Sequence, residues 1–105
     1  PCSKTLYCSG QIPLNPQTGE IVGSNAAEQA KQVLENLTAV ISASGANLSQ
    51  VVKTTIYVKS MDDFAAINTV YGSFFAEPFP ARATVEVARL PKDVLVEIDA
   101  IVVCD

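Results

Sequence analysis

The last apolar run of the chain constrains the fold more than any other segment. In residues 94–103, "VLVEIDAIVV", every second side chain is apolar, which predicts a strand with one wholly buried face. That face is made up of Val94, Val96, Ile98, Ala100 and Val102. A strand of this kind needs a second layer over its apolar face, so helices are expected to pack on it.

Two helices are predicted to supply that layer. The first begins after Asn25, which can cap it together with Glu28, and ends at Gly45. The second begins after Ser60 and ends at "EPFP". Their apolar stripes consist of Ala30, Val33, Leu34, Leu37, Val40 and Ile41 in the first helix and Phe64, Ile67, Tyr71 and Phe75 in the second.

The remaining elements complete a single sheet. Strands are predicted at 5–11, 50–60, 81–89 and 94–103, with a brief strand around Ile21. The order β(β)αβαββ indicates one α+β domain over residues 1–105, with both helices packed on one face of the sheet. The last two strands are expected to form an antiparallel pair.

Composition excludes several classes of protein. The 105 residues have a net charge of −4 and seven scattered basic residues, so no clustered basic surface for nucleic acid is expected. The absence of histidine excludes Ser-His-Asp and Cys-His catalysis within one chain. Cys2, Cys8 and Cys104 lack zinc spacing and are interpreted as three reduced thiols. Without a membrane-length apolar run or a leader, the protein is expected to be cytoplasmic, with an organellar form left open.

The second face of the last two strands mixes polar and aliphatic side chains. A hairpin that keeps the apolar faces of the two strands together places their polar residues together on the other side. These residues are Arg82, Thr84, Glu86, Glu97 and Asp99, with the aliphatic Leu95, Ile101 and Val103 beside them. The mixture predicts a subunit interface rather than a solvated surface.

Arg82 and Glu97 within that face allow two interpretations. An arginine can hold a carboxylate ligand through two parallel hydrogen bonds, and a partly desolvated glutamate can position or activate a water molecule. The alternative is a cross-strand ion pair that only stabilises the sheet. The pattern alone favours this structural alternative, because ion pairs outnumber functional sites.

Three segments in order resemble the RidA (YjgF) family of reactive-intermediate deaminases, formerly described as endoribonucleases. They are "LYCSGQIPLNPQTGEIV", "VVKTTIYVKSMDDFAAINTVYGSFF" and "PARATVEVARLPKDVLVEIDAI". The signature of the family is a Pro-Ala-Arg block followed at a fixed distance by a hydrophobic-Glu-Ile block. Here the two blocks are 80–82 and 96–98, and the likeness covers nearly the whole chain.

The resemblance implies a chorismate-mutase-like α+β fold and a homotrimer with clefts between its subunits. It implies a 2-iminobutanoate/2-iminopropanoate deaminase, which hydrolyses 2-imino acids or their enamine tautomers to 2-keto acids and ammonia without a metal or cofactor. Such reactive species are released by pyridoxal-phosphate dehydratases acting on threonine or serine. The implied partner is therefore a small imino acid, not a nucleic acid or a membrane.

The same resemblance assigns roles to individual residues. Arg82 corresponds to the arginine that binds the substrate carboxylate, and Glu97 corresponds to the glutamate thought to position the water. Ser9 and Gly10 belong to the SGQ segment that lines the pocket, and Asn68 matches a recurrent asparagine of the second helix.

The chain departs from the family pattern in three places. Thr84 stands where many bacterial members have cysteine, and it is expected to shape the pocket or donate a hydrogen bond, because a threonine without an adjacent base is a poor nucleophile. Family members usually begin further upstream with a Gly-Pro-Tyr-Ser segment, so a shortened or truncated N-terminus is expected. The "FFAEPFP" stretch is also shorter than usual.

Two other functions remain as alternatives. The first is an RNA-cleaving translation inhibitor, which the acidic balance and the absence of histidine disfavour. The second is a trimer that binds carboxylate ligands without turnover, against which Glu97 argues weakly. The sequence does not determine the preferred side chain of the imine or the physiological partner enzyme.

Overall fold

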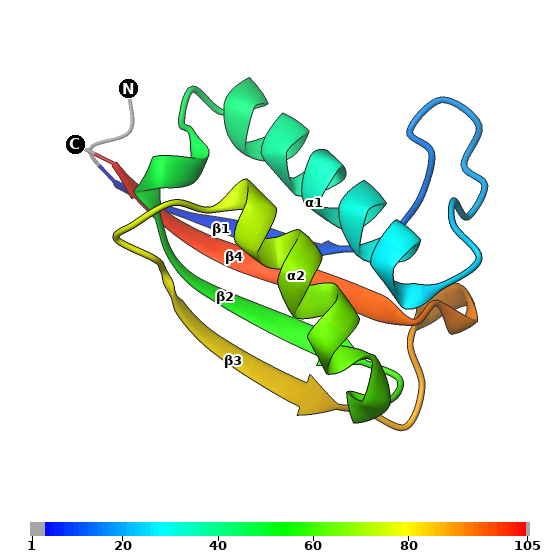
Figure 1. Cartoon of the computed structure of the whole chain (residues 1–105). Coiled ribbons are helices and arrows are strands. Elements are labelled where there is room, and N and C mark those ends of the chain that lie inside the picture. The colour runs from blue at the N-terminus through cyan, green and yellow to red at the C-terminus, as the bar shows by residue number, and fades with distance from the viewer. Residues whose placement is uncertain (1–3, 105) are drawn as a thin grey trace.

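The computed structural model describes residues 4–104 as a four-stranded sheet with two helices on one face (Figure 1). The strands are β1 (Lys4–Gln11), β2 (Val51–Val58), β3 (Ala81–Glu86) and β4 (Val96–Cys104), and the helices are α1 (Ala26–Ala43) and α2 (Phe64–Phe74). Single 3-10 turns precede β2, α2 and β4, and an isolated bridge joins Leu14 to Ile21. The predicted α+β class and the two helices on one face are confirmed.

Local signals at both ends explain the limits of α1. The Asn25 side chain accepts a hydrogen bond from the Glu28 N–H at 2.9 Å, while the Glu28 carboxylate accepts from the Ser24 N–H instead of closing a box on Asn25. At the other end Gly45 has a φ of +90°, and the Ala46 N–H reaches back to the Ile41 carbonyl. This left-handed ending is the one that glycine favours, so the predicted boundaries are confirmed.

The order of the strands in the sheet is β1-β4-β2-β3. β2 and β3 are parallel neighbours joined through α2, whereas β4 runs antiparallel to both β1 and β2. The helix-containing connection between β2 and β3 is the kind that parallel strands require. β4 is therefore a central strand, and β3 lies at an edge.

The predicted antiparallel pairing of the last two strands is wrong. β3 and β4 are separated by β2, and the segment between them contains the 3-10 turn Pro91–Asp93 instead of a tight hairpin turn. The β2-α2-β3 unit determines the place of β3, because a helical crossover returns the chain parallel to the strand it has just left. The register between β3 and β2 consequently determines which side of the sheet each β3 side chain faces.

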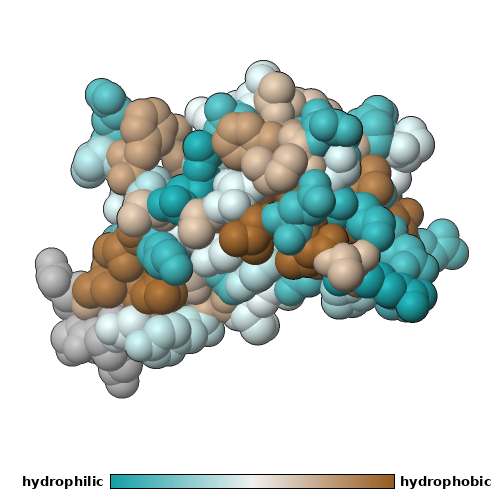
Figure 2. Space-filling view, turned by 90° about the horizontal axis from the view of Figure 1, so that it is seen from below, coloured by the Kyte–Doolittle hydropathy of each residue, from teal (hydrophilic) through white to brown (hydrophobic). Residues whose placement is uncertain are grey.

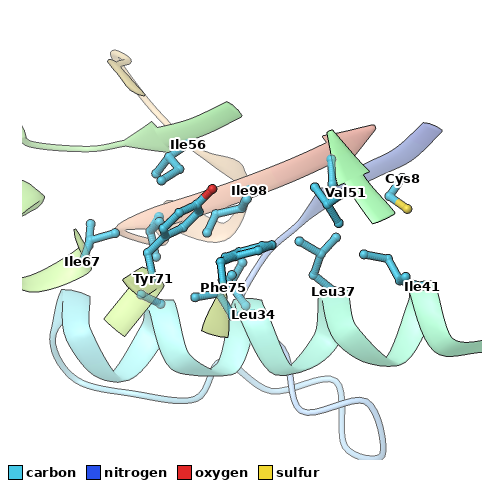
Figure 3. Packing of buried hydrophobic residues seen from close by; sticks show 14 of the residues in the cluster. Cys8, Leu34, Leu37, Ile41, Val51, Ile56, Ile67, Tyr71, Phe75 and Ile98 are labelled. Atoms are coloured by element: carbon cyan, nitrogen blue, oxygen red, sulfur yellow. The ribbon is translucent and has the colours of Figure 1, made fainter. Parts of the chain in front are cut away.

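The core lies between the helices and the apolar face of β4 (Figure 3). All five residues predicted for that face are buried, with exposed fractions of 2% or less. Leu34 and Leu37 of α1 and Ile67 of α2 pack against this face of the sheet. Val40 is 41% exposed, so its predicted place in the buried stripe of α1 is wrong.

The irregular start of β2 accounts for a second difference in burial. The pairing of β2 with β4 shifts register between Val51 and Lys53, and this irregularity turns Val52 to solvent while Val51 is buried. From Thr54 onward the predicted alternation holds, with Thr54, Ile56 and Val58 facing the helices. Thr54 is thus a polar residue on the buried face.

The prediction of three reduced thiols is wrong for one of the two cysteines that the structure describes. Cys8 is a free, buried thiol, and burial raises its pKa. Cys104 is disulfide-bonded, and Cys2 lies outside the described residues.

Within residues 4–104, neither α1 nor α2 is long and apolar enough to cross a membrane.

Candidate functional site

Arg82 lies on the helix-covered side of the sheet. It pairs with Thr54 across β2 and β3, and side chains of directly paired residues project to the same face. Thr54 is 1% exposed beneath α2, so Arg82 projects toward that helix from the edge strand. Thr84 and Glu86 alternate with it on the same side, and the Glu86 carboxylate accepts a hydrogen bond from the Met61 N–H at 2.8 Å.

Three residues of α2 hold the Arg82 guanidinium group. Its central carbon lies 5.3 Å from the centre of the Phe64 ring and 5.0 Å from the centre of the Tyr71 ring. One guanidinium N–H donates to the Asn68 side-chain oxygen. These spacings of four and three residues place Phe64, Asn68 and Tyr71 on one face of the helix. The cation is therefore positioned by two aromatic faces and one amide.

A buried hydrogen bond anchors the Tyr71 ring. The Tyr71 hydroxyl lies 2.8 Å from the Thr54 hydroxyl, and Tyr71 also packs against Phe75 with ring centres 4.7 Å apart. Burial raises the pKa of Tyr71, so its hydroxyl stays neutral and keeps this hydrogen bond across the ordinary pH range. Figure 3 shows the Tyr71 ring between α2 and the sheet. The position of the arginine is thereby linked to the core.

A cavity of about 460 Å³ opens beside the guanidinium group. It is lined by Asn68, Tyr71, Gly72, Phe79, Pro80 and Arg82. Asn68 and Arg82 carry polar groups for a carboxylate or amine, while Phe79 and Pro80 present apolar surface. A pocket that combines apolar walls with a few convergent polar groups is typical of a small-molecule site.

Arg82 makes no ion pair with the residues that the structure describes. The one ion pair within 4–104 joins Arg89 to Asp93, with a 2.7 Å contact between Nε and Oδ1. Arg89 thus forms a structural ion pair, which was the alternative role considered for Arg82. A guanidinium group that is held in place without a carboxylate is suited to receive one from a ligand.

Glu97 lies on the opposite, open face of the sheet. It pairs with Tyr57 across β4 and β2, and its neighbours along β4, Val96 and Ile98, are buried on the helix side. The carboxylate lies against the backbone of Gly10, in the irregular part of β1 between Cys8 and Gln11. A side chain at position 10 would place its first carbon 2.8 Å from Glu97 Cδ, so only glycine leaves this carboxylate where it is.

The surroundings of Glu97 favour its protonated form more than water does. Burial raises the pKa of Glu97, and the neighbouring Asp99 carboxylate raises it further. Asp99 accepts a hydrogen bond from the Tyr57 hydroxyl at 3.0 Å, and this bond is the largest cause of a raised pKa at Tyr57. A carboxylate with a raised pKa is a better proton acceptor than an ordinary surface glutamate.

The predicted polar face is therefore wrong in one respect. Arg82, Thr84 and Glu86 share the helix side, whereas Glu97 and Asp99 share the open side. The error follows from the hairpin assumption, because β3 takes its register from β2 and not from β4. Within one chain the structure forms two groups, Arg82 with Asn68 and Glu97 with Gly10, and the sheet separates them.

Sequence reasoning missed the aromatic platform under Arg82. Phe64 and Tyr71 were predicted only as core residues of the second helix, although the interval of three or four residues around Asn68 was visible. Phe79 and Gly72 were not predicted as site residues. The signal that could have found them is the parallel β2-α2-β3 unit, since it places β3 directly beside α2.

The open side and the β3 edge are not uniformly polar. Figure 2, seen from the β3 side, shows hydrophobic patches between hydrophilic ones. Exposed apolar residues of the open face include Tyr7, Val85 and Val103, with exposed fractions of 75%, 42% and 44%. Ser9 lines a second groove of about 460 Å³ on this face together with Tyr7, Tyr57 and Asp99.

The fold and the two groups of residues define a class: a small α+β protein with a positioned arginine and a partly buried glutamate. A family model described as Endoribonuclease L-PSP matches residues 2–104. The chain belongs to this family, which includes the RidA and YjgF proteins, and the resemblance stated from the sequence is confirmed.

Similar proteins of known name come from bacteria and archaea. The 2-iminobutanoate/2-iminopropanoate deaminase of Escherichia coli K12 is 54% identical over 101 residues, which covers 93% of this chain and 78% of the enzyme. A RutC family protein of Pyrococcus horikoshii is 54% identical over 96 residues, covering 91% of this chain and 76% of that protein. Several other relatives, including one from Synechocystis, also have only this family name.

Solved structures share the fold closely. A structure described as a putative endoribonuclease from Thermotoga maritima has a TM-score of 0.93 and 46% identity, covering 96% of this chain and 80% of that one. The E. coli protein TdcF with bound serine has a TM-score of 0.91 and 45% identity, covering 96% and 81%.

Proposed function

We propose that this protein hydrolyses 2-imino acids, or their enamine tautomers, to 2-keto acids and ammonium. The observation that carries the proposal is the Arg82 guanidinium group, held by Phe64, Tyr71 and Asn68 and without a carboxylate partner in the described residues. A 2-imino acid supplies that carboxylate one bond away from its reacting carbon. Fixing the carboxylate therefore also orients the carbon that water attacks.

The reaction needs little more than a positioned water. The iminium carbon is already electrophilic, and the sum R–C(=NH₂⁺)–COO⁻ + H₂O gives R–CO–COO⁻ + NH₄⁺. As the C–O bond forms, Glu97 accepts a proton from the water and the C=N electron pair moves to nitrogen. Glu97 then returns the proton to nitrogen. The C–N bond breaks as the hydroxyl oxygen forms the C=O bond, and the hydroxyl proton passes through Glu97 to the departing ammonia, which leaves as ammonium. Its raised pKa suits this exchange, because the group must both take and give a proton.

The two groups of residues meet only if a second copy of the chain contributes. Arg82 with Asn68 and Thr84 would bind the substrate on one subunit, and Glu97 with Ser9 and Gly10 would complete the site from its neighbour. Their positions on opposite sides of one sheet support this division. The exposed apolar side chains of the open face, including Val103, support a closed ring such as a homotrimer.

The relatives support the same chemistry. The E. coli deaminase that is 54% identical to this chain is named for 2-iminobutanoate and 2-iminopropanoate, both small 2-imino acids. TdcF binds serine, which has an α-carboxylate next to a nitrogen-bearing carbon, as an imino acid does. We extend this substrate class to the present chain.

The direct test generates the imine in the assay mixture with an amino acid oxidase and catalase. Release of ammonium and 2-keto acid is followed with and without the protein, and faster release is expected with it. Sedimentation at micromolar concentration tests the assembly. A stable monomer with full activity would contradict a site shared between subunits.

Complementation gives a sharper test of the shared site. Arg82→Ala and Glu97→Gln are each expected to be nearly inactive, but a mixture that is dissociated and reassembled should recover activity. In a ring, roughly one quarter of the sites receive both intact halves, because each half is intact with a probability of about one half. Without recovery in reassembled rings, the arginine and glutamate halves cannot come from different subunits.

RNA cleavage is the second candidate, which the family description and the description of the Thermotoga maritima structure favour. The chain has no histidine, and its net charge is −4. An RNA-binding site would show affinity that falls steeply with salt, so a titration with labelled RNA at two salt concentrations distinguishes the candidates. The remaining candidate, a trimer that binds carboxylate ligands without turnover, would bind 2-keto acids but leave the rate of imine hydrolysis unchanged.

A further inference from the structure

We infer that Tyr57 is a positioning residue of the proposed reaction: its hydroxyl group holds Asp99 as a charged hydrogen-bond acceptor, so that the proton bound by this pair of carboxylates goes to Glu97. The inference rests on the proposed function, in which Glu97 accepts a proton from water and later returns it. Tyr57 lies outside both groups of site residues, Arg82 with Asn68 and Glu97 with Gly10.

The register of the sheet brings the three side chains together. Glu97 and Asp99 are two residues apart in β4, so both project to the open side. Tyr57 is the direct cross-strand partner of Glu97, and its hydroxyl reaches diagonally to the Asp99 carboxylate at 3.0 Å. All three side chains are half-buried. Tyr57 thus lies opposite one carboxylate and is hydrogen-bonded to the other.

The two carboxylates differ in their hydrogen-bond partners. Asp99 accepts a hydrogen bond from Tyr57, whereas within residues 4–104 no group donates one to Glu97. A donor stabilises the ionised form of its acceptor, and each of two neighbouring carboxylates disfavours a second negative charge beside it. The pair therefore binds its first proton at Glu97, the member without a donor.

Burial and hydrogen bonding act in the same direction. Burial raises the pKa of Glu97, and the Asp99 carboxylate raises it further, an effect that lasts only while Asp99 is charged. The hydrogen bond to Asp99 is the largest cause of the raised pKa of Tyr57, so the phenol remains a donor while Glu97 titrates. Each residue therefore keeps one role: Tyr57 donates, Asp99 accepts, and Glu97 exchanges the proton.

The other titratable side chains on the open side of the strands come from β1 and β2. Lys53 pairs with Ile101, and Lys59 donates to a backbone carbonyl at 2.6 Å. Tyr7 of β1 also pairs with Ile101, away from both carboxylates. The open-side residues of β3 carry no charge and are Ala81, Ala83 and Val85. Among the residues that the structure describes, no second donor to a carboxylate of this pair offsets the effect of Tyr57.

The test measures how kcat/KM depends on pH in the assembled protein. Tyr57→Phe removes only the hydroxyl group, so Asp99 should begin to share the proton, and the acid limb should broaden and move to lower pH by roughly 0.3–1 unit. In an Asp99→Asn background the same change should leave the limb in place, which a merely structural role of Tyr57 would not produce. The arginine of a neighbouring subunit is the same in every variant, so these differences do not come from it.

Tyr7→Phe is the matched control. Its hydroxyl lies on the same side of the sheet but, in the part of the chain that the structure describes, donates to no carboxylate. This variant should leave the acid limb in place. An equal shift in Tyr7→Phe and Tyr57→Phe would contradict a specific role for the hydrogen bond to Asp99.

A titration that does not depend on turnover separates the inference from the proposed function. NMR of the side-chain carboxyl carbons follows Glu97 and Asp99 in the assembled wild-type protein and in Tyr57→Phe. Glu97 should take up the first proton in the wild type, and in the variant the two signals should change over the same pH range. If the wild-type protein hydrolyses no imine, the proposed function fails, and this titration alone decides the inference. First protonation at Asp99, or a Glu97 titration that Tyr57→Phe leaves unchanged, would overturn it.

Discussion

Replacement of Arg82 is the most direct probe of the proposed chemistry. Arg82→Ala removes the group expected to bind the substrate carboxylate, and loss of such a charge-assisted anchor costs about 2–4 kcal/mol. That corresponds to a fall of roughly 30- to 1,000-fold in kcat/KM. Arg82→Lys keeps the charge but loses the planar pair of donors, so it should also impair turnover, by a smaller factor.

The geometry separates this effect from a loss of stability. Arg82 is exposed, and its two aromatic contacts are worth about 0.5–1 kcal/mol each at an exposed site. Arg82→Ala should therefore lower the free energy of unfolding by only about 1–2 kcal/mol. The protein should still assemble, because the buried Thr54–Tyr71 hydrogen bond and the core below it are unchanged.

The assay measures 2-keto acid and ammonium release from freshly generated imine, with sedimentation and thermal unfolding on the same samples. Arg89→Ala is the matched control, because Arg89 has a surface ion pair with Asp93 and lies outside the cavity beside Arg82. It should leave kcat/KM nearly unchanged. Full imine hydrolysis by a correctly assembled Arg82→Ala protein would refute the role of Arg82 as the anchor.

Four further predictions concern the residues of the open side and Thr84. Burial and Asp99 raise the pKa of Glu97, so the acid limb of the kcat/KM profile should lie above the ordinary glutamate range, and Asp99→Asn should move it to lower pH. Because of this raised pKa, the folded protein binds more protons than the unfolded chain near the ordinary glutamate pKa. The free energy of unfolding should therefore fall as pH rises from the ordinary glutamate pKa through the raised one. In denaturant titrations Glu97→Gln should remove this fall. Gly10→Ala should displace the Glu97 carboxylate and lower kcat about tenfold or more, with little loss of stability, because the group that must move is the end of a flexible side chain; unchanged kcat would show that Glu97 is not positioned by this contact. Thr84→Ala should change kcat/KM by less than about fivefold, since no base adjoins the hydroxyl, and abolished activity would reverse the roles given to Thr84 and Glu97.

Features that depend on neighbours in the sequence were predictable. Asn25 and Gly45 marked the ends of α1, and the alternation identified the buried residues of β4 from Val96 to Val102, although not Cys104. The same alternation could not say which strand lies beside β4. Sequence period gives the two faces of each strand but not how the faces of different strands match, which depends on strand order and register.

The candidate site shows the same limit. Arg82 and Glu97 were identified from their place in β-prone runs and from the family motif, but their separation by the sheet follows from the parallel pairing of β2 with β3. The aromatic contacts of Arg82 were hidden because Phe64 and Tyr71 also fit a buried stripe. One helix face can serve the core and the site at once, and spacing alone does not separate the two uses.

Arg82 and Glu97 lie on opposite sides of one sheet, and this separation affects how activity would depend on protein concentration. Under the proposed function, a lone subunit carries every reacting group and yet contains no complete site. Specific activity would then depend on protein concentration, falling as copies separate and returning as they reassociate. A cell could silence such an enzyme by a change in abundance alone, without any ligand, modification or movement within the subunit.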